Sequence, residues 1–292
     1  MTYPVPRTAD LAERDRLDLQ HEILKSAAGG LYLARDAVQR ALSPRADGSV
    51  PRILDLGTGS GKWAVDMAKE FPQAEVIGLD LAPVHPSEKP PSNCRFILGD
   101  CNTCLNDPSY EGAFDMIQAR CIVNGVLNYS NFIRHIWKAL RPGGVFFAIE
   151  GRLTCYDEHR QQLGVQDERD PEYSWQHKLL SIAGEAIIAR NDQLKYLDDV
   201  PTWLKEMGDA WEDSGNQALW TPIGAWDKCE SMLQNCLEFT ESVQPMLLLR
   251  GHPKESVQIW AQNARKELEE QSLKQWSKWG AVWAVKRRLT EG

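Results

Sequence analysis

The chain has 292 residues and a formal net charge of −8. Acidic character without a long basic run argues against nucleic acid as an obligate partner, since phosphate binding needs concentrated Lys and Arg. No apolar stretch reaches the roughly 20 residues that span a bilayer, and because the N-terminus is polar we do not expect it to be a secretory signal. We therefore expect a cytoplasmic protein with no membrane partner. The seven cysteines are irregularly spaced, and a single Cys101-x-x-Cys104 predicts reduced thiols rather than a zinc site.

Residues 1–49 carry apolar residues at helical spacing and predict an N-terminal helical segment, with helices over 18–24 and 31–42. From residue 50 the pattern changes to short apolar strands that alternate with helices. This pattern indicates an α/β fold in which helices cover both faces of a parallel sheet. We expect residues 50–150 to form a Rossmann-like core. Its expected strands are 52–56, 74–80, 95–100, 114–119 and 145–149, and its expected helices are 63–71 and 132–140.

Residues 151–292 are predicted to form a mostly helical substrate cover that also supplies the last strands of the same domain. Most of the eleven tryptophans lie in this part of the chain. Such a composition is typical of a pocket for apolar substrates, or of helices that pack on one another. The expected helices are 174–190, 200–211 and 255–268, and the expected strands are 218–223 and 279–285.

A glycine-rich loop, Gly57-Thr-Gly59-Ser-Gly61, joins the first strand to a helix, where glycine permits a tight turn with the backbone close to a ligand. Its spacing is one residue shorter than the dinucleotide fingerprint, and the carboxylate of Asp55 would repel a pyrophosphate. Both features argue against a nicotinamide-dependent oxidoreductase. Asp80 and Asp100 follow the next two strands, where each could instead cap a turn. Ligands of open α/β sheets bind at these strand ends, so three acids there favour a ligand site.

Five segments resemble the successive motifs of class I S-adenosylmethionine-dependent methyltransferases: ILDLGTGSGKW, VIGLDLAP, FILGD, FDMIQAR and LRPGGVFFAIE. More narrowly, DLQHEIL, the tryptophan after the glycine loop, QAR and TPIGAW resemble the fungal LaeA-like methyltransferases. The resemblance implies a Rossmann-like sheet of seven mostly parallel strands with N-terminal helices, and S-adenosylmethionine as cofactor. The cofactor contacts that it implies are Asp55, Gly57, Thr58, Gly59, Ser60, Gly61, Trp63, Asp80, Leu81, Asp100, Cys101, Asn102, Gln118 and Arg120.

Within this pattern each part of the cofactor has its own partners. Asp55 and the glycine loop would hold the methionine moiety, and Asp80 would bind the ribose hydroxyls. Leu81 would pack near the adenine, whose edge would meet Asp100 and Cys101. The segment from Gln118 to Arg120 would lie under the cofactor near the substrate opening.

The implied reaction is displacement at the sulfonium methyl by a small-molecule acceptor, which we expect to be an oxygen nucleophile in fungal secondary metabolism. A base is needed only where the acceptor holds its proton tightly. The candidates are Glu150, which could instead pair with Arg152 or Arg120, His159, which could be an exposed loop residue, and His21, which could serve packing. No metal-ligand pattern stands near Glu150, so we expect no metal.

The same resemblance supports an alternative, a regulator of secondary metabolism that binds S-adenosylmethionine and acts through protein partners. Founding LaeA-like proteins are associated with the control of metabolite clusters. A closed pocket formed by residues 152–215 would favour the enzyme, whereas an open cleft with an exposed apolar patch would favour the regulator. The sequence leaves open whether the chain forms a homodimer.

Overall fold

A seven-stranded sheet forms the centre of the computed structural model, which describes residues 11–170, 173–188, 199–227 and 230–288. The strand order is β3-β2-β1-β4-β5-β7-β6. Strands β1 to β5 run parallel to one another, whereas β7 runs antiparallel to both β5 and β6. The mostly parallel Rossmann-like sheet predicted from the sequence is thus confirmed. The strands are β1 Arg52–Leu56, β2 Glu75–Asp80, β3 Cys94–Leu98, β4 Phe114–Arg120, β5 Leu140–Tyr156, β6 Trp211–Ile223 and β7 Gln275–Lys286.

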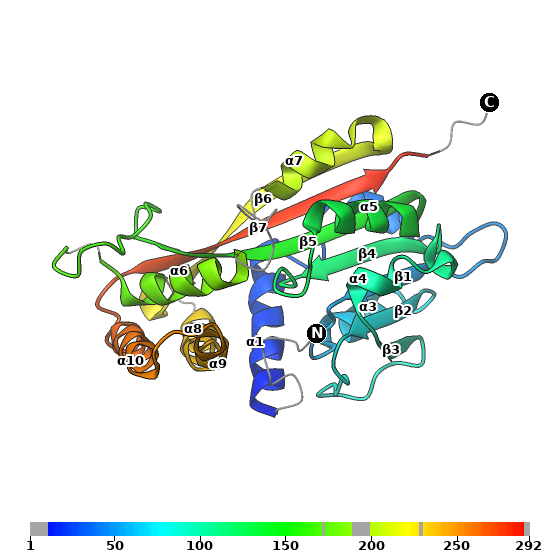
Figure 1. Cartoon of the computed structure of the whole chain (residues 1–292). Helices are drawn as coiled ribbons and strands as arrows, with labels where there is room; N and C mark the ends of the chain where they lie inside the picture. The colour runs from blue at the N-terminus through cyan, green and yellow to red at the C-terminus, as the bar shows by residue number, and fades with distance from the viewer. Residues whose placement is uncertain (1–10, 171–172, 189–198, 228–229, 289–292) are drawn as a thin grey trace.

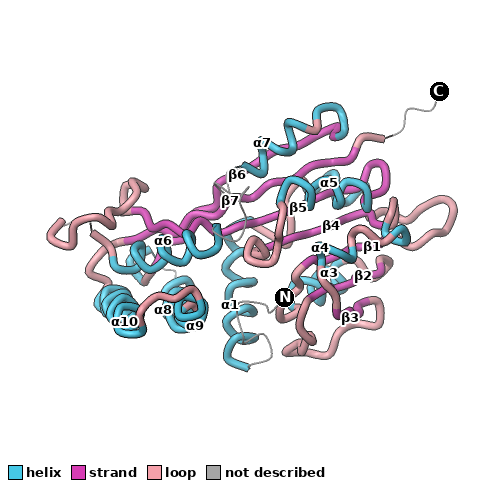
Figure 2. The backbone as a smooth tube through the Cα atoms, viewed as in Figure 1, coloured by secondary structure: helices cyan, strands magenta, loops and turns pink. Residues whose placement is uncertain are grey.

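Helices cover both faces of the sheet (Figure 2). One buried cluster joins the N-terminal helices and α3 to one face, and a second joins α5 and α7 to the other. Alternation along β5 divides its side chains between them, so that Phe147 belongs to the first cluster and Phe146 to the second. The helices are α1 Leu11–Ala28, α2 Arg35–Ala41, α3 Lys62–Glu70, α4 Cys101–Cys104, α5 Tyr129–Ala139, α6 Trp175–Ile188, α7 Asp199–Glu206, α8 Glu230–Ser242, α9 Gln244–Leu249 and α10 Lys254–Glu270.

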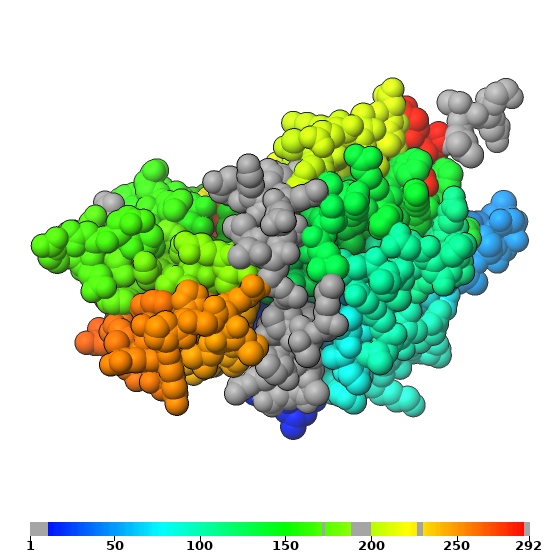
Figure 3. All heavy atoms as spheres, in the orientation of Figure 1, coloured from blue at the N-terminus to red at the C-terminus, as the bar shows by residue number. Residues whose placement is uncertain are grey.

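Strands β5, β6 and β7 extend as a ribbon beyond the other strands, and helices α6, α8, α9 and α10 gather along this extension (Figure 1). In Figure 3 these helices, in green and orange, form one side of the molecule and the sheet core the other. Helix α1 lies between the two and contacts both α3 and α8. Among the helices in the described ranges, none has the length and the apolar run needed to cross a bilayer.

The largest disagreement with the sequence predictions lies between residues 200 and 223. The helix predicted over 200–211 is wrong at its end, because α7 stops at Glu206 and Trp211 already begins β6. Gly208 has a left-handed backbone, φ 54°, and separates the two elements. Strands β5, β6 and β7 are each longer than predicted, and β5 runs across position 150, where we placed a domain boundary. The predicted third strand also ends early, at Leu98.

Candidate functional site

A continuous cavity begins at the carboxyl-terminal edge of β1, β2 and β4 and extends past α1 to the helices along the ribbon. Its first part collects most of the residues that the sequence assigned to a cofactor. Its walls also include residues of α1 that the sequence did not assign individually, Leu17 and Gln20, although the DLQHEIL motif pointed to this helix. The predicted residues that line the cavity are Asp55, Gly57, Thr58, Gly59, Ser60, Trp63, Asp80, Leu81, Cys101, Gln118 and Arg120.

The glycine loop is held in a conformation that side chains would disturb. Gly57 and Gly59 have φ angles of 65° and 58°, in the left-handed region. A Cβ atom on Gly57 would overlap the side chain of Ile122, which follows β4. The loop is fixed by the amide of Thr58, which donates to the carbonyl of Leu79 at 3.0 Å. The backbone is therefore free to approach a ligand in the cavity.

Asp55, at the end of β1, lies at the bottom of the cavity and is 2% exposed. The Thr58 hydroxyl donates to its Oδ2 at 2.6 Å, and Gln118 Nε2 donates to its Oδ1 at 2.9 Å. Burial raises the pKa of Asp55 to about 6, against these hydrogen bonds and the positive charge of Arg120. Gln118 Oε1 is buried without a hydrogen-bond partner among the described residues. The site therefore offers acceptor oxygens to a donor group such as an ammonium.

Asp80, at the end of β2, connects the two loops that border the cavity. Its Oδ2 accepts a hydrogen bond from the Gly59 amide at 2.8 Å, and its Oδ1 accepts one from the Ala82 amide at 3.1 Å. Burial raises the pKa of Asp80, and the backbone hydrogen bonds oppose that shift. Each carboxylate oxygen can accept a further bond. Asp80 thus fixes the glycine loop and retains the capacity to bind hydroxyl groups.

Three of the predicted cofactor contacts lie outside the described cavity lining. Asp100 does not end a strand; it caps α4, where its Oδ1 accepts from the amide of Asn102 at 2.9 Å. Asn102 donates in turn to the Gly125 carbonyl at 2.7 Å and so ties α4 to the loop after β4. Neither residue belongs to the described cavity lining, although Cys101 between them does. Gly61 is also outside the lining, and a Cβ atom there would meet Phe96.

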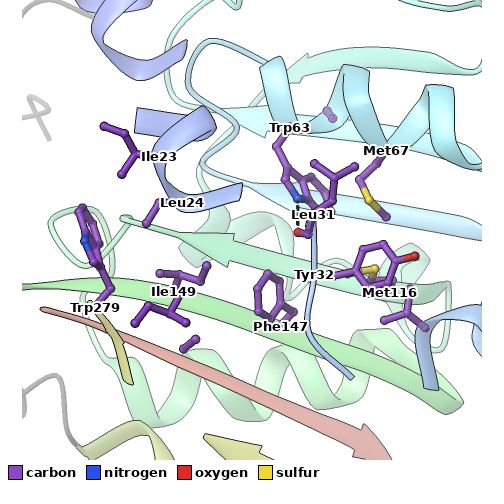
Figure 4. Close-up of a cluster of buried hydrophobic side chains, with 14 of the residues drawn as sticks. Ile23, Leu24, Leu31, Tyr32, Trp63, Met67, Met116, Phe147, Ile149 and Trp279 are labelled. Carbon is purple, nitrogen blue, oxygen red and sulfur yellow. Dashed lines mark hydrogen bonds between the residues drawn. The ribbon is translucent and has the colours of Figure 1, made fainter. Parts of the chain in front are cut away.

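Trp63 holds the N-terminal segment against the sheet core. Its indole is 1% exposed, and Nε1 donates to the Leu31 carbonyl at 2.8 Å, the dashed line in Figure 4. The surrounding side chains include Tyr32, Met67 and Phe147. Trp63 also lines the cavity. Its main contribution is therefore to position α1 and the segment that follows it beside the cavity.

His21, on α1, joins that helix to the core through a buried polar network. Its Nε2 lies 3.1 Å from Asp66 Oδ2, and its Nδ1 lies 3.0 Å from Arg120 Nη2. Because a guanidinium only donates, Nδ1 is the acceptor and the proton resides on Nε2. Burial lowers the pKa of His21, and the Asp66 bond opposes this shift. Both ring nitrogens are occupied, so the geometry favours a positioning role for His21 over that of a base.

The carboxylate of Asp66 lies close to His21 and Glu22, the three residues of the described chain whose ligand atoms could surround a metal ion. Three ammonium groups already pair with this carboxylate: Lys25 at 2.9 Å, Lys62 at 3.6 Å and Lys69 at 3.9 Å. Burial opposes ionisation of Asp66, but the hydrogen bonds from His21 and Lys25 outweigh it and hold its pKa well below the usual range. Ion pairing between α1 and α3 therefore explains why His21, Glu22 and Asp66 lie together.

Glu150 lines the cavity on β5 and is 4% exposed. Its Oε1 accepts hydrogen bonds from the Ile122 amide at 3.1 Å and from the Tyr129 hydroxyl at 3.2 Å, so the anticipated pairing with an arginine is replaced by these two donors. Burial raises the pKa of Glu150 to about 8 against both bonds. At neutral pH this carboxyl group is mainly protonated, which leaves it a donor rather than a base.

His159, the remaining candidate base, is exposed on the loop that follows β5 and lies outside the described cavity lining. Its amide donates to Asp157 Oδ1 at 2.9 Å as part of a turn. The turn explains the polar sequence that suggested a substrate cover here. Helices α6, α8 and α9, which fall within the predicted cover of residues 151–292, contribute side chains to the distant part of the cavity.

Comparison with known proteins assigns the chain to a family. The profile of the family described as "Methyltransferase domain" matches residues 48–197. The chain therefore belongs to this methyltransferase family, whose methyl donor, S-adenosylmethionine, is its cofactor. The fold, the glycine loop and the acids at the strand ends agree with that assignment.

Among curated relatives, the secondary metabolism regulator laeA of Coprinopsis cinerea is 30% identical over 80% of this chain and 58% of its own length. The methyltransferase pytC of Aspergillus terreus is 28% identical over 83% of this chain and 69% of its own length. The chain thus spans a little over half the length of the laeA proteins that it matches. The similarity to LaeA-like proteins that the motifs indicated is confirmed.

Two solved structures also align with most of the chain. The phosphoethanolamine N-methyltransferase 2 of Haemonchus contortus, in complex with S-adenosylmethionine, is 17% identical with a TM-score of 0.47, over 97% of this chain and 61% of that one. The plantazolicin methyltransferase BpumL, in complex with a plantazolicin analogue and S-adenosylhomocysteine, is 13% identical with a TM-score of 0.48, over 96% and 89%.

Proposed function

We propose that this protein transfers a methyl group from S-adenosylmethionine to an oxygen of a small molecule, in fungal secondary metabolism. The observation that carries the proposal is the continuous cavity, which joins the glycine loop to a region lined by α6 and α8. A donor at the loop and an acceptor under the helices would share one continuous space. Positioning of two reactants in this way accounts for a large part of many rate enhancements.

The cofactor would supply a methyl group activated by a sulfonium charge, and the residues would orient it. Asp55 and the glycine loop would hold the methionine moiety, since the unpartnered Gln118 Oε1 and the Asp55 carboxylate favour an ammonium group. Asp80 would bind the ribose hydroxyls, with Leu81 and Cys101 beside the adenine. Asp100 and Asn102 would act indirectly, through the shape of the loop that they stabilise.

The proposal needs no base within the protein. Glu150 holds a proton at neutral pH and His21 has both nitrogens engaged. The acceptor oxygen would attack the methyl carbon while its bond to sulfur breaks, S-adenosylhomocysteine would leave, and the acceptor proton would pass to water. This route suits an acceptor whose hydroxyl proton is weakly held, such as a phenol or an enol.

A regulator that acts through protein partners is the second candidate, because several relatives carry that description. The region that distinguishes the two is 152–215, where Arg152, Leu153 and α6 residues line the cavity. A cavity that continues from the glycine loop to these residues favours the enzyme. We further propose a cytoplasmic location, with nucleic acid and membrane absent from its partners; a homodimer stays a prediction.

The experiment that tests the proposal uses S-adenosylmethionine labelled on its methyl group, incubated with the protein and extracts of fungal cultures. We expect label in an extractable small molecule, which mass spectrometry identifies as a methyl ether. Label only in protein, or no transfer by a sample that binds S-adenosylhomocysteine, would count against the enzyme and favour the regulator. A sample that does not bind S-adenosylhomocysteine would contradict the proposed cofactor site.

A further inference from the structure

The part of the cavity that lies beyond α1 has a different chemistry from the part at the glycine loop. We call it the acceptor chamber and define it by Leu153, Gln176, Leu180, Phe239, Val243 and Met246. All residues that α6, α8, α9 and β6 are described as contributing to the lining are uncharged. Strand β5 also contributes Glu150 and Arg152, which already interact with Tyr129 and Tyr156, respectively. An ion without a counter-charge loses far more on leaving water than an apolar molecule does. The chamber therefore favours an uncharged guest.

A charged pair on α1, near the acceptor chamber, does not alter the preference for an uncharged guest. Arg16 and Glu13, both buried, form an ion pair in which Nη2 and Oε1 are 2.6 Å apart. Arg16 Nη1 also reaches the Asn235 Oδ1 atom of α8 at 3.5 Å. These two charges satisfy one another, so they leave no net charge for an ionised ligand to neutralise.

Gln176 gives the chamber one polar feature. The residue is fully buried on α6, and its Nε2 has no hydrogen-bond partner among the described residues. The Thr240 hydroxyl lies 3.3 Å from Gln176 Oε1 and 2.9 Å from the Cys236 carbonyl, and it has a single proton to donate. If the hydroxyl donates to Cys236, the amide can be turned so that Nε2 donates to Thr240. In either orientation one end of the amide is left unpaired.

An unpaired buried amide group costs on the order of 1–3 kcal/mol, which a ligand can recover by supplying the missing partner. A hydroxyl or carbonyl group would do so, because each can pair with a carboxamide. We propose that the acceptor chamber binds an uncharged, largely apolar molecule with one hydrogen-bonding oxygen, and that Gln176 determines this preference by pairing with that oxygen. This inference rests on the proposed function and narrows its substrate class.

Three flat probes of similar size separate the effects of apolar contact, of a hydrogen-bonding oxygen and of charge on binding. They are 2-naphthol, naphthalene and 2-naphthoate, and the affinity of each is measured by equilibrium dialysis with S-adenosylhomocysteine present. We expect 2-naphthol to bind at least about 10-fold more tightly than either of the others, because naphthalene lacks the oxygen and naphthoate carries a charge. Naphthoate binding as tightly as naphthol would overturn the inference. Absence of naphthol binding by a protein that binds S-adenosylhomocysteine would also overturn it.

Gln176→Leu should weaken 2-naphthol binding about 10-fold and leave naphthalene unchanged. Gln234→Leu is the matched control, because Gln234 lies exposed on α8 and bonds only to Glu238 at 2.7 Å in the described structure. An unchanged ratio of naphthol to naphthalene affinity in Gln176→Leu would refute the role of Gln176. Should that variant fail to fold, Leu180→Phe decides, since a larger side chain in the chamber should abolish naphthol binding and spare S-adenosylhomocysteine binding.

Discussion

Glu150 makes stability depend on pH in a way that a single substitution can isolate. Its pKa rises from 4.5 to about 8 in the folded protein, through burial. A raised carboxyl pKa stabilises the fold fully below pH 4.5, and the contribution is lost as the pH rises through 8. With about 1.4 kcal/mol for each pKa unit, the loss between pH 5 and 9 is about 4 kcal/mol. Glu150→Gln should remove this dependence, because a carboxamide imitates the protonated acid.

The assay is urea unfolding followed by tryptophan fluorescence at pH 5, 7 and 9, with the free energy of unfolding obtained by linear extrapolation. Other groups titrate equally in both proteins, so the difference between the wild type and Glu150→Gln isolates the carboxyl group. We expect near-equal stability at pH 5 and a variant that is more stable by several kcal/mol at pH 9. Parallel pH profiles would refute the assignment of Glu150 as a protonated buried acid.

Three further predictions concern the elements around the cavity. Gly57→Ala should lower the free energy of unfolding by more than about 2 kcal/mol. Gly112→Ala is the control: its φ of 58° is similar, but the space around it is open, so the cost should be about 1 kcal/mol. Equal effects of the two substitutions in urea unfolding would contradict the contact with Ile122. Asp66→Asn should weaken the attachment of α1 and increase amide hydrogen exchange in this helix at neutral pH. The difference in exchange between the wild type and the variant should disappear as the pH falls through the lowered pKa of Asp66, and unchanged exchange in α1 would contradict the network. Trp63→Phe should cost about 1–3 kcal/mol in thermal unfolding, because the Leu31 carbonyl loses its donor; an unchanged unfolding temperature would argue against that bond.

The sheet core was accessible from sequence because its strands are buried on both faces. Strands β1, β2 and β4 are largely apolar runs, and each was predicted within one residue at either end. The first half of strand β6 was missed, since most of the residues that follow Trp211, from Glu212 to Gln217, are polar and exposed at the sheet edge. Val200, Leu204, Met207 and Trp211 follow a helical spacing, so the pattern continued the helix across Gly208.

The parts of the site that could be predicted from the sequence are those encoded by local motifs. The glycine loop, Asp55 and Asp80 are encoded within strand-end segments, and the structure brings them to one cavity. The network of His21, Asp66 and Arg120 joins three elements that are distant in sequence, so no local sequence pattern predicts it. Burial of Glu150 depends likewise on Tyr129 and the loop after β4, which explains why its protonation could not be anticipated.

The central claim is that the cavity at the glycine loop holds the methyl donor, with Asp80 on its ribose. Calorimetric titration of S-adenosylhomocysteine and of NADH into the wild type and into Asp80→Ala tests it most directly. We predict that S-adenosylhomocysteine binds the wild type, that NADH does not, and that Asp80→Ala weakens binding by about 1–3 kcal/mol. Equal affinity of the two proteins for S-adenosylhomocysteine would remove Asp80 from the site, and preferential binding of NADH would contradict the account.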